Sequence, residues 1–211
     1  RASYPILRQE HALVVNAAGG TPIQHTAWRF NDVEGQWRVS LTPEFVTLET
    51  TKYTSRRDLL DRLCAVVKAL VTHIDPKVMD RLGVRYIDRV VGAPVEDIAR
   101  FVRAEVLGIG ATKAFGHVQH AVTEALFDAS GDAQVLARWG RIPPGLTVDP
   151  AAIEPTSDVS WILDLDMFST APKPFDVESI VGEAGRFAER LYTVFRWAVT
   201  DDFLRHYGGD L

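Results

Sequence analysis

The sequence WRVSLTPEFVTLETTKY occupies residues 37–53 and decides the fold class. Both of its ends are rich in β-branched and aromatic residues, which is typical of strands, and only residues 42–44 separate them. Because a connection this short cannot cross over a sheet, the two strands are predicted to be antiparallel. Upstream, Trp28-Arg29-Phe30 ends where a polar, glycine-bearing segment begins at 31–36, which predicts a hairpin with the strand at 37–41.

A helix is predicted to follow these strands. Ser55 is a suitable N-cap residue, and Asp58 stands three positions later, as in a capping box. Apolar residues then recur at three- and four-residue spacing until Asp75-Pro76, which is expected to end the helix. The second half is predicted to repeat strands and then helix: strands at 82–91, 115–128, 134–141 and 159–169, with helices at 95–107 and 177–206.

The predicted fold class is therefore α+β, with antiparallel sheets built from two strand-rich halves, each followed by an amphipathic helix. We expect a single domain over residues 1–211, with two similar halves at about 1–76 and 77–211. The long C-terminal helix is expected to pack on the sheet through Phe187, Leu191 and Phe195.

Composition excludes several classes of protein. The chain has 211 residues, 46% of them hydrophobic, and a net charge of −5, which are the proportions of a globular protein. The single cysteine, Cys64, forms no intrachain disulfide. No long basic stripe is present, so nucleic acid is not the expected main partner, and no apolar run suits a membrane span. The default location is cytoplasmic, although a leader ahead of Arg1 is left open.

Sequence motifs for catalysis are absent. The chain has no phosphate-binding loop, no HExxH and no GxSxG, and we expect no cofactor. Asp164 and Asp166 alternate along a predicted strand and are weak candidates for a metal or acid–base pair. The simpler interpretation is that they lie on the wet face of a strand whose other face is apolar.

The most unusual segment is 81–89, where a strand would place Arg81, Arg85 and Arg89 on one face. Three arginines on one strand face repel one another unless carboxylates or an anionic partner lie opposite. Glu49, on a strand face that also carries Tyr53, is the carboxylate we expect there. These five residues are the candidate binding surface, and the alternative is a purely structural cross-strand ladder.

Two strand motifs in this chain carry a resemblance. Residues 47–53, TLETTKY, and residues 81–88, RLGVRYID, resemble the "sLeT..Y" and "RlGlRYiN" patterns of a sporadically distributed family of uncharacterised bacterial proteins. The family pattern has Asn where this chain has Asp88. The resemblance implies no particular activity, and the patchy distribution of the family implies a defence or mobile-element context.

Three classes of function follow from these observations. The first is a non-enzymatic binding or regulatory protein that acts through contact with another protein or with itself. The second is an enzyme that acts on an anionic, phosphate- or carboxylate-bearing substrate. The third is a small-ligand carrier with a pocket between sheet and helix.

Overall fold

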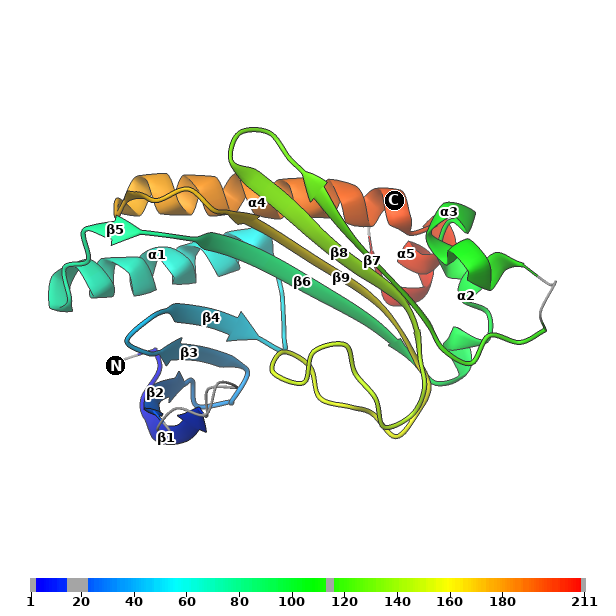
Figure 1. Ribbon diagram of the computed structural model, residues 1–211, viewed down its shortest axis with the longest axis horizontal. Coiled ribbons are helices and arrows are strands. Elements are labelled where there is room, and N and C mark those ends of the chain that lie inside the picture. Colours follow the sequence, from blue (N-terminus) through cyan, green and yellow to red (C-terminus); the bar gives the residue numbers. More distant parts are fainter. Residues whose placement is uncertain (1–2, 15–22, 113–115, 210–211) are drawn as a thin grey trace. The chain divides into compact units, whose positions relative to one another are not determined.

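The computed structural model describes residues 3–14, 23–112 and 116–209. The chain divides into two compact units, Arg1–Pro76 and Lys77–Leu211, which we call the N-terminal and C-terminal units. Figure 1 shows the elements of each unit along the chain.

In the described part of the N-terminal unit, the chain forms a four-stranded antiparallel sheet and one helix. The strands lie in chain order, so each pairs with the next through a short connection. The predicted hairpin and the antiparallel strand after it are both confirmed. The elements are β1 (Ile6–Val14), β2 (Ile23–Asn31), β3 (Trp37–Leu41), β4 (Val46–Thr50) and α1 (Arg56–His73).

Helix α1 begins where the sequence predicted. The hydroxyl of Ser55 accepts a hydrogen bond from the backbone N–H of Asp58 at 3.1 Å, which satisfies one free donor of the first turn. The Asp58 carboxylate does not complete a capping box. It accepts from the Thr54 hydroxyl at 3.1 Å and from Nε of Arg62 at 2.9 Å.

The C-terminal unit is built on a second antiparallel sheet, of strand order β6-β9-β8-β7, with a small β10-β5 pair beside it. At Gly140 (φ 146°) a side chain would collide with the carbonyl oxygen of Ala121, so glycine permits the close approach of β7 and β8. The strands are β5 (Val78–Met79), β6 (Leu82–Val91), β7 (Ala121–Asp128), β8 (Ala133–Ile142), β9 (Ser160–Ser169) and β10 (Lys173–Pro174).

Helix α4 (Val177–Ala198) packs against β6 and β9 and forms the core of this unit with them (Figure 1). Phe187 and Leu191 are buried, and Phe195 packs against them while half-buried. The predicted α+β class is confirmed, including the long C-terminal helix on the sheet. Two of the five tryptophans, Trp37 and Trp161, are fully buried, whereas Trp197 is exposed.

The C-terminal helix is shorter than predicted. It stops at Ala198 because Val199 forms a β-bridge with Val102, and Thr200 then caps a new helix, α5 (Asp201–Tyr207). The same bridge holds Val102 extended and divides the helix predicted at 95–107. In its place are short turns: η1 (Ala93–Val95), α2 (Ile98–Phe101), α3 (Ala104–Leu107) and η2 (Gly108–Ala111).

Candidate functional site

Three features of the described residues are candidate sites: the arginine-bearing face of β6, a polar cavity in the N-terminal unit, and the outer edge of β7. The first was predicted from the sequence, and the other two were not.

The arginine-bearing face is the face of the C-terminal sheet away from α4. Strand alternation places Tyr86 in the core and Arg85 on the opposite face. There Nε and Nη2 of Arg85 donate to the two carboxylate oxygens of Asp164 at 2.7 and 2.8 Å, and Nη1 donates to Asp149 at 2.7 Å. Asp164 is 1% exposed, so this carboxylate is buried with its counter-charges.

Two more arginines extend this network. Arg138 on β8 places Nε 3.3 Å from the same Asp164 carboxylate, and Arg81 donates to Asp166 at 3.0 Å. The hydrogen bond to Asp164 is the largest influence that raises the pKa of Arg85, and Arg85 in turn lowers the pKa of Asp149. Burial raises the pKa of Asp166 despite its contact with Arg81. Arg81, Arg85 and Arg138 are neutralised by carboxylates of their own unit, which leaves these three little capacity to bind an external anion.

The loop at 143–159 lies on this face and accounts for the burial. Asp149 from the loop reaches Arg85, and the carbonyl oxygen of Glu154 accepts a hydrogen bond from Arg89 at 2.8 Å. Ile142 and Ile162, on the same face, are buried. The sequence predicted a wet face for Asp164, and that prediction is wrong because the loop folds back over it.

Glu49 and Tyr53 do not complete the predicted ladder. Glu49 on β4 forms an ion pair with Arg38 of the neighbouring β3 at 3.1 Å, in register with it. β4 and β6 belong to different sheets, so no cross-strand ladder joins Glu49 to Arg85. Tyr53 follows β4 and is exposed. The carboxylates that lie opposite the arginines are Asp164, Asp166 and Asp149 instead.

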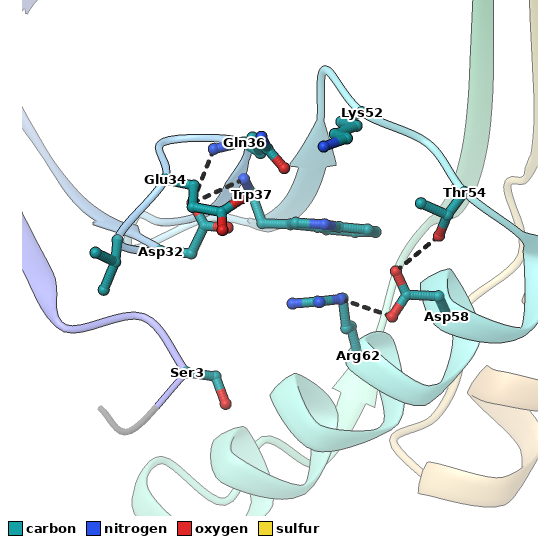
Figure 2. Close-up of a pocket in the computed structure, with 10 residues that line it drawn as sticks. Ser3, Asp32, Glu34, Gln36, Trp37, Lys52, Thr54, Asp58 and Arg62 are labelled. Carbon is teal, nitrogen blue, oxygen red and sulfur yellow. Dashed lines mark hydrogen bonds and ion pairs between the residues drawn. The ribbon is translucent and has the colours of Figure 1, made fainter.

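A polar cavity of about 490 Å³ lies in the N-terminal unit (Figure 2). Its centre is the buried ring of Trp37, and the guanidinium of Arg62 stacks on that ring at 4.3 Å. The carboxylate of Asp58 holds Arg62 in place through a hydrogen bond, and the nearby Tyr4 hydroxyl and the Asp58 carboxylate raise the pKa of Arg62. The lining residues are Ser3, Asp32, Val33, Glu34, Gln36, Trp37, Lys52, Thr54, Asp58 and Arg62.

Most of the residues that line the cavity are polar or charged, which suits a small polar molecule. Asp32 is already used by the hairpin turn, because its carboxylate accepts from the backbone N–H groups of Gln36 and Trp37. Lys52 and Glu34 contribute charges of opposite sign to the lining (Figure 2). The carrier hypothesis placed a pocket between sheet and long helix, whereas this cavity lies between the β2–β3 hairpin, the segment after β4 and the start of α1.

The third feature is the outer edge of β7, the last strand of the C-terminal sheet. β7 pairs with β8 one-to-one over all eight residues, without a bulge, and no described strand pairs with its other side. Leu126 on one face is 57% exposed and Phe127 on the other is 52% exposed. The sequence signal for an open edge was the presence of apolar residues on both faces of this strand. The prediction of a hairpin here did not take that signal into account.

The described residues show neither a metal site nor a membrane-spanning helix. No group of three or more histidine, cysteine, aspartate or glutamate side chains could hold a metal ion there. No helix in the described part of the chain is long and apolar enough to cross a bilayer. Comparison of the chain with protein-family models, with curated proteins and with solved structures finds no match.

Proposed function

We propose that this protein is a non-catalytic binding protein that acts through contact with another polypeptide, and that its working surface is the outer edge of β7. There an extended segment of a partner would add a fifth strand to the β6-β9-β8-β7 sheet. The unpaired edge of β7, with its exposed Leu126 and Phe127, carries this proposal. Strand addition gains affinity from main-chain hydrogen bonds and specificity from alternate side chains.

The proposal rests on the absence from β7 of features that usually protect a free strand edge. Proteins protect a free strand edge with lysine, proline, bulges or charges, because an open edge pairs with other chains. β7 has the sequence AVTEALFD, without lysine or proline, and its register with β8 is unbroken. Its two carboxylates, Glu124 and Asp128, both contact side chains of β8. β6, at the other end of the same sheet, carries Arg85, Asp88 and Arg89. β1, at the end of the N-terminal sheet, carries Arg8, Glu10 and His11.

The arginine face supports this choice of surface by elimination. Arg81, Arg85 and Arg138 each have a carboxylate within 3.3 Å, and Asp164 is buried between two of them. A carboxylate held in this way by two guanidinium groups is poorly suited to proton transfer or metal binding.

Site-specific photo-crosslinking in cells of the source organism tests the proposal. A photoreactive phenylalanine replaces Leu126, and the control replaces Ile109, which is 62% exposed but lies on η2. We expect an adduct with a defined peptide of one protein from position 126 and none from position 109. A second substitution, Phe127→Lys, should lower the yield at 126 by placing a charge on the edge. Equal yields from 126 and 109, or no adduct from 126, would overturn the proposal.

A second candidate function, carriage of a small polar ligand, is favoured by the cavity around Trp37 and Arg62. Its volume of about 490 Å³ is enough for a small ligand, although the cavity is widely open to solvent. A metabolite panel screened by thermal unfolding should yield a stabilising compound. Lys52→Ala should abolish that stabilisation, whereas Lys68→Ala, on an exposed part of α1, should preserve it. The same stabilisation in both variants would contradict this function.

A further inference from the structure

We infer that the strand added at β7 is β7 of a second copy of this chain, paired antiparallel about a two-fold axis at Ala125. This inference rests on the proposed function and names its partner. Two-fold symmetric pairs are the commonest assemblies of soluble proteins, and an edge strand that pairs antiparallel with itself satisfies that symmetry directly.

The symmetry limits the register. In an antiparallel pair, residues directly opposite each other have their side chains on the same face of the sheet. An axis between two successive residues would set residues of opposite faces against each other, so the two-fold axis must lie at a residue. An axis at Glu124 or at Ala125 pairs seven residues of each β7, and an axis at Leu126 pairs only five. These three registers differ mainly in where the two carboxylates of the strand fall.

Charge selects among these registers. An axis at Glu124 places that carboxylate opposite itself, and an axis at Leu126 places Glu124 opposite Asp128 of the other copy. Like charges directly opposite destabilise a sheet. With the axis at Ala125, Glu124 lies opposite Leu126 and Asp128 lies opposite Val122. This register avoids both repulsions.

The carboxylates of β7 do not require a cationic partner. Glu124 lies 3.7 Å from Nε of Arg138 on the adjacent β8, and Asp128 accepts a hydrogen bond from Gln134 at 3.2 Å. Each copy therefore supplies its own counter-charge and donor. A foreign basic strand would be the expected occupant if these carboxylates were unengaged.

The side chains also fit. In the Ala125 register, Phe127 lies opposite Thr123 of the other copy on the face of the sheet that carries α4, and this contact occurs twice. The two small Ala125 side chains lie between these pairs, which leaves room for both phenyl rings. On the opposite face, Leu126 covers the aliphatic part of Glu124. The two most exposed apolar side chains of β7, Leu126 and Phe127, are thereby covered.

The salt dependence distinguishes a second copy from a basic peptide. The chain carries a net charge of −5, so two copies repel each other at long range. Added salt screens this repulsion and should strengthen self-pairing. Binding of a basic strand to Glu124 and Asp128 should weaken instead.

Light scattering and sedimentation of the purified chain test the inference. At high micromolar concentration, we expect twice the mass of one chain and a dissociation constant that falls as salt rises. Phe127→Lys should weaken dimerisation more than tenfold, and Ile109→Lys, at a somewhat more exposed site, should not change it. Circular dichroism confirms that each variant is folded. Leu126→Glu, which places a carboxylate opposite Glu124 of the other copy, serves as a second edge variant.

Cross-linking tests the register. In a Cys64→Ser background, Ala125→Cys should form dimers with a short bis-maleimide, because the two residues lie opposite each other. Ala121→Cys should not, since its copies would be about 27 Å apart at about 3.4 Å per residue. A monomer at both low and high salt would overturn the inference. If position 126 still forms a specific adduct with another protein in cells, the proposed function survives. Without that adduct, both fail.

Discussion

Arg85 on β6 binds the buried carboxylate of Asp164 on β9 through two parallel hydrogen bonds, although the two residues are 79 positions apart in the chain. Planar guanidinium and carboxylate groups match in this arrangement, and Asp164 has Arg138 as a second counter-charge. The arrangement makes the arginine face a structural element that ties β6, β9 and β8 together.

This pair should be strongly coupled in unfolding experiments. Arg85→Ala removes the main counter-charge of a buried carboxylate and should lower the free energy of unfolding by about 3–5 kcal/mol. The double variant with Asp164→Ala should lose less than the sum of the single losses, by more than about 1 kcal/mol. Denaturant unfolding of the four proteins measures both quantities.

The control is Arg38→Ala, which breaks the exposed ion pair with Glu49 and should cost no more than about 1 kcal/mol. Arg85→Ala and Glu49→Ala should be additive. Additive losses for Arg85 and Asp164, or coupling between Arg85 and Glu49, would contradict the structural role given to Asp164.

Asp88 provides a test of pH dependence. It lies on the α4-facing side of β6, between Tyr86 and Val90 and opposite Leu163, and burial raises its pKa to about 6. Between about pH 4 and pH 6 the folded chain holds a proton that the unfolded chain has lost, so stability falls as pH rises through this range. Asp88→Asn, the residue of the family pattern, removes the ionisable group.

We expect Asp88→Asn to raise the free energy of unfolding at pH 7 by up to about 3 kcal/mol, which corresponds to two units of pKa. At pH 4 the variant and the natural chain should have nearly equal stability. Urea unfolding at the two pH values measures this difference. A gain of the same size at both would assign the effect to packing rather than to ionisation.

Phe187 tests the core under α4. It is buried against the sheet, so Phe187→Ala should cost about 3–5 kcal/mol through lost burial and the cavity that remains. Arg190→Ala, on an exposed part of the same helix, should change the free energy of unfolding by no more than about 0.5 kcal/mol. Thermal or denaturant unfolding measures both. A loss below about 1 kcal/mol for Phe187→Ala would show that this helix face is not part of the core.

The sequence predicts local pairing well and distant pairing poorly. Alternation predicted β6 with the bounds it has, and short connections predicted the β2–β3–β4 order. The prediction that Glu49 lies opposite Arg85 was wrong because Glu49 and Asp164 both occupy alternating strand positions, and nothing in the local sequence distinguishes them. Only the pairing of β6 with β9 does so.

The other differences between the predicted and the observed structure also arise from contacts between segments that are distant in the chain. The bridge between Val102 and Val199 overrides the helical pattern of both segments, as tertiary contacts often override propensity. The return of the 143–159 loop over Asp164 is also a tertiary event. The cavity around Trp37 joins three segments whose patterns, taken singly, predict only a hairpin and a helix cap.

Amide hydrogen exchange of β7 tests the central claim most directly, since the claim is that the outer edge of this strand is open and takes up another strand. At high dilution, the alternate N–H groups of β7 that point away from β8 should exchange rapidly, while the amides of the central strand β9 stay protected. At high protein concentration the same β7 groups should become protected, and Phe127→Lys should prevent this change. Full protection of every β7 amide at high dilution, to the level of β9, would show that the edge is already covered and would contradict the account.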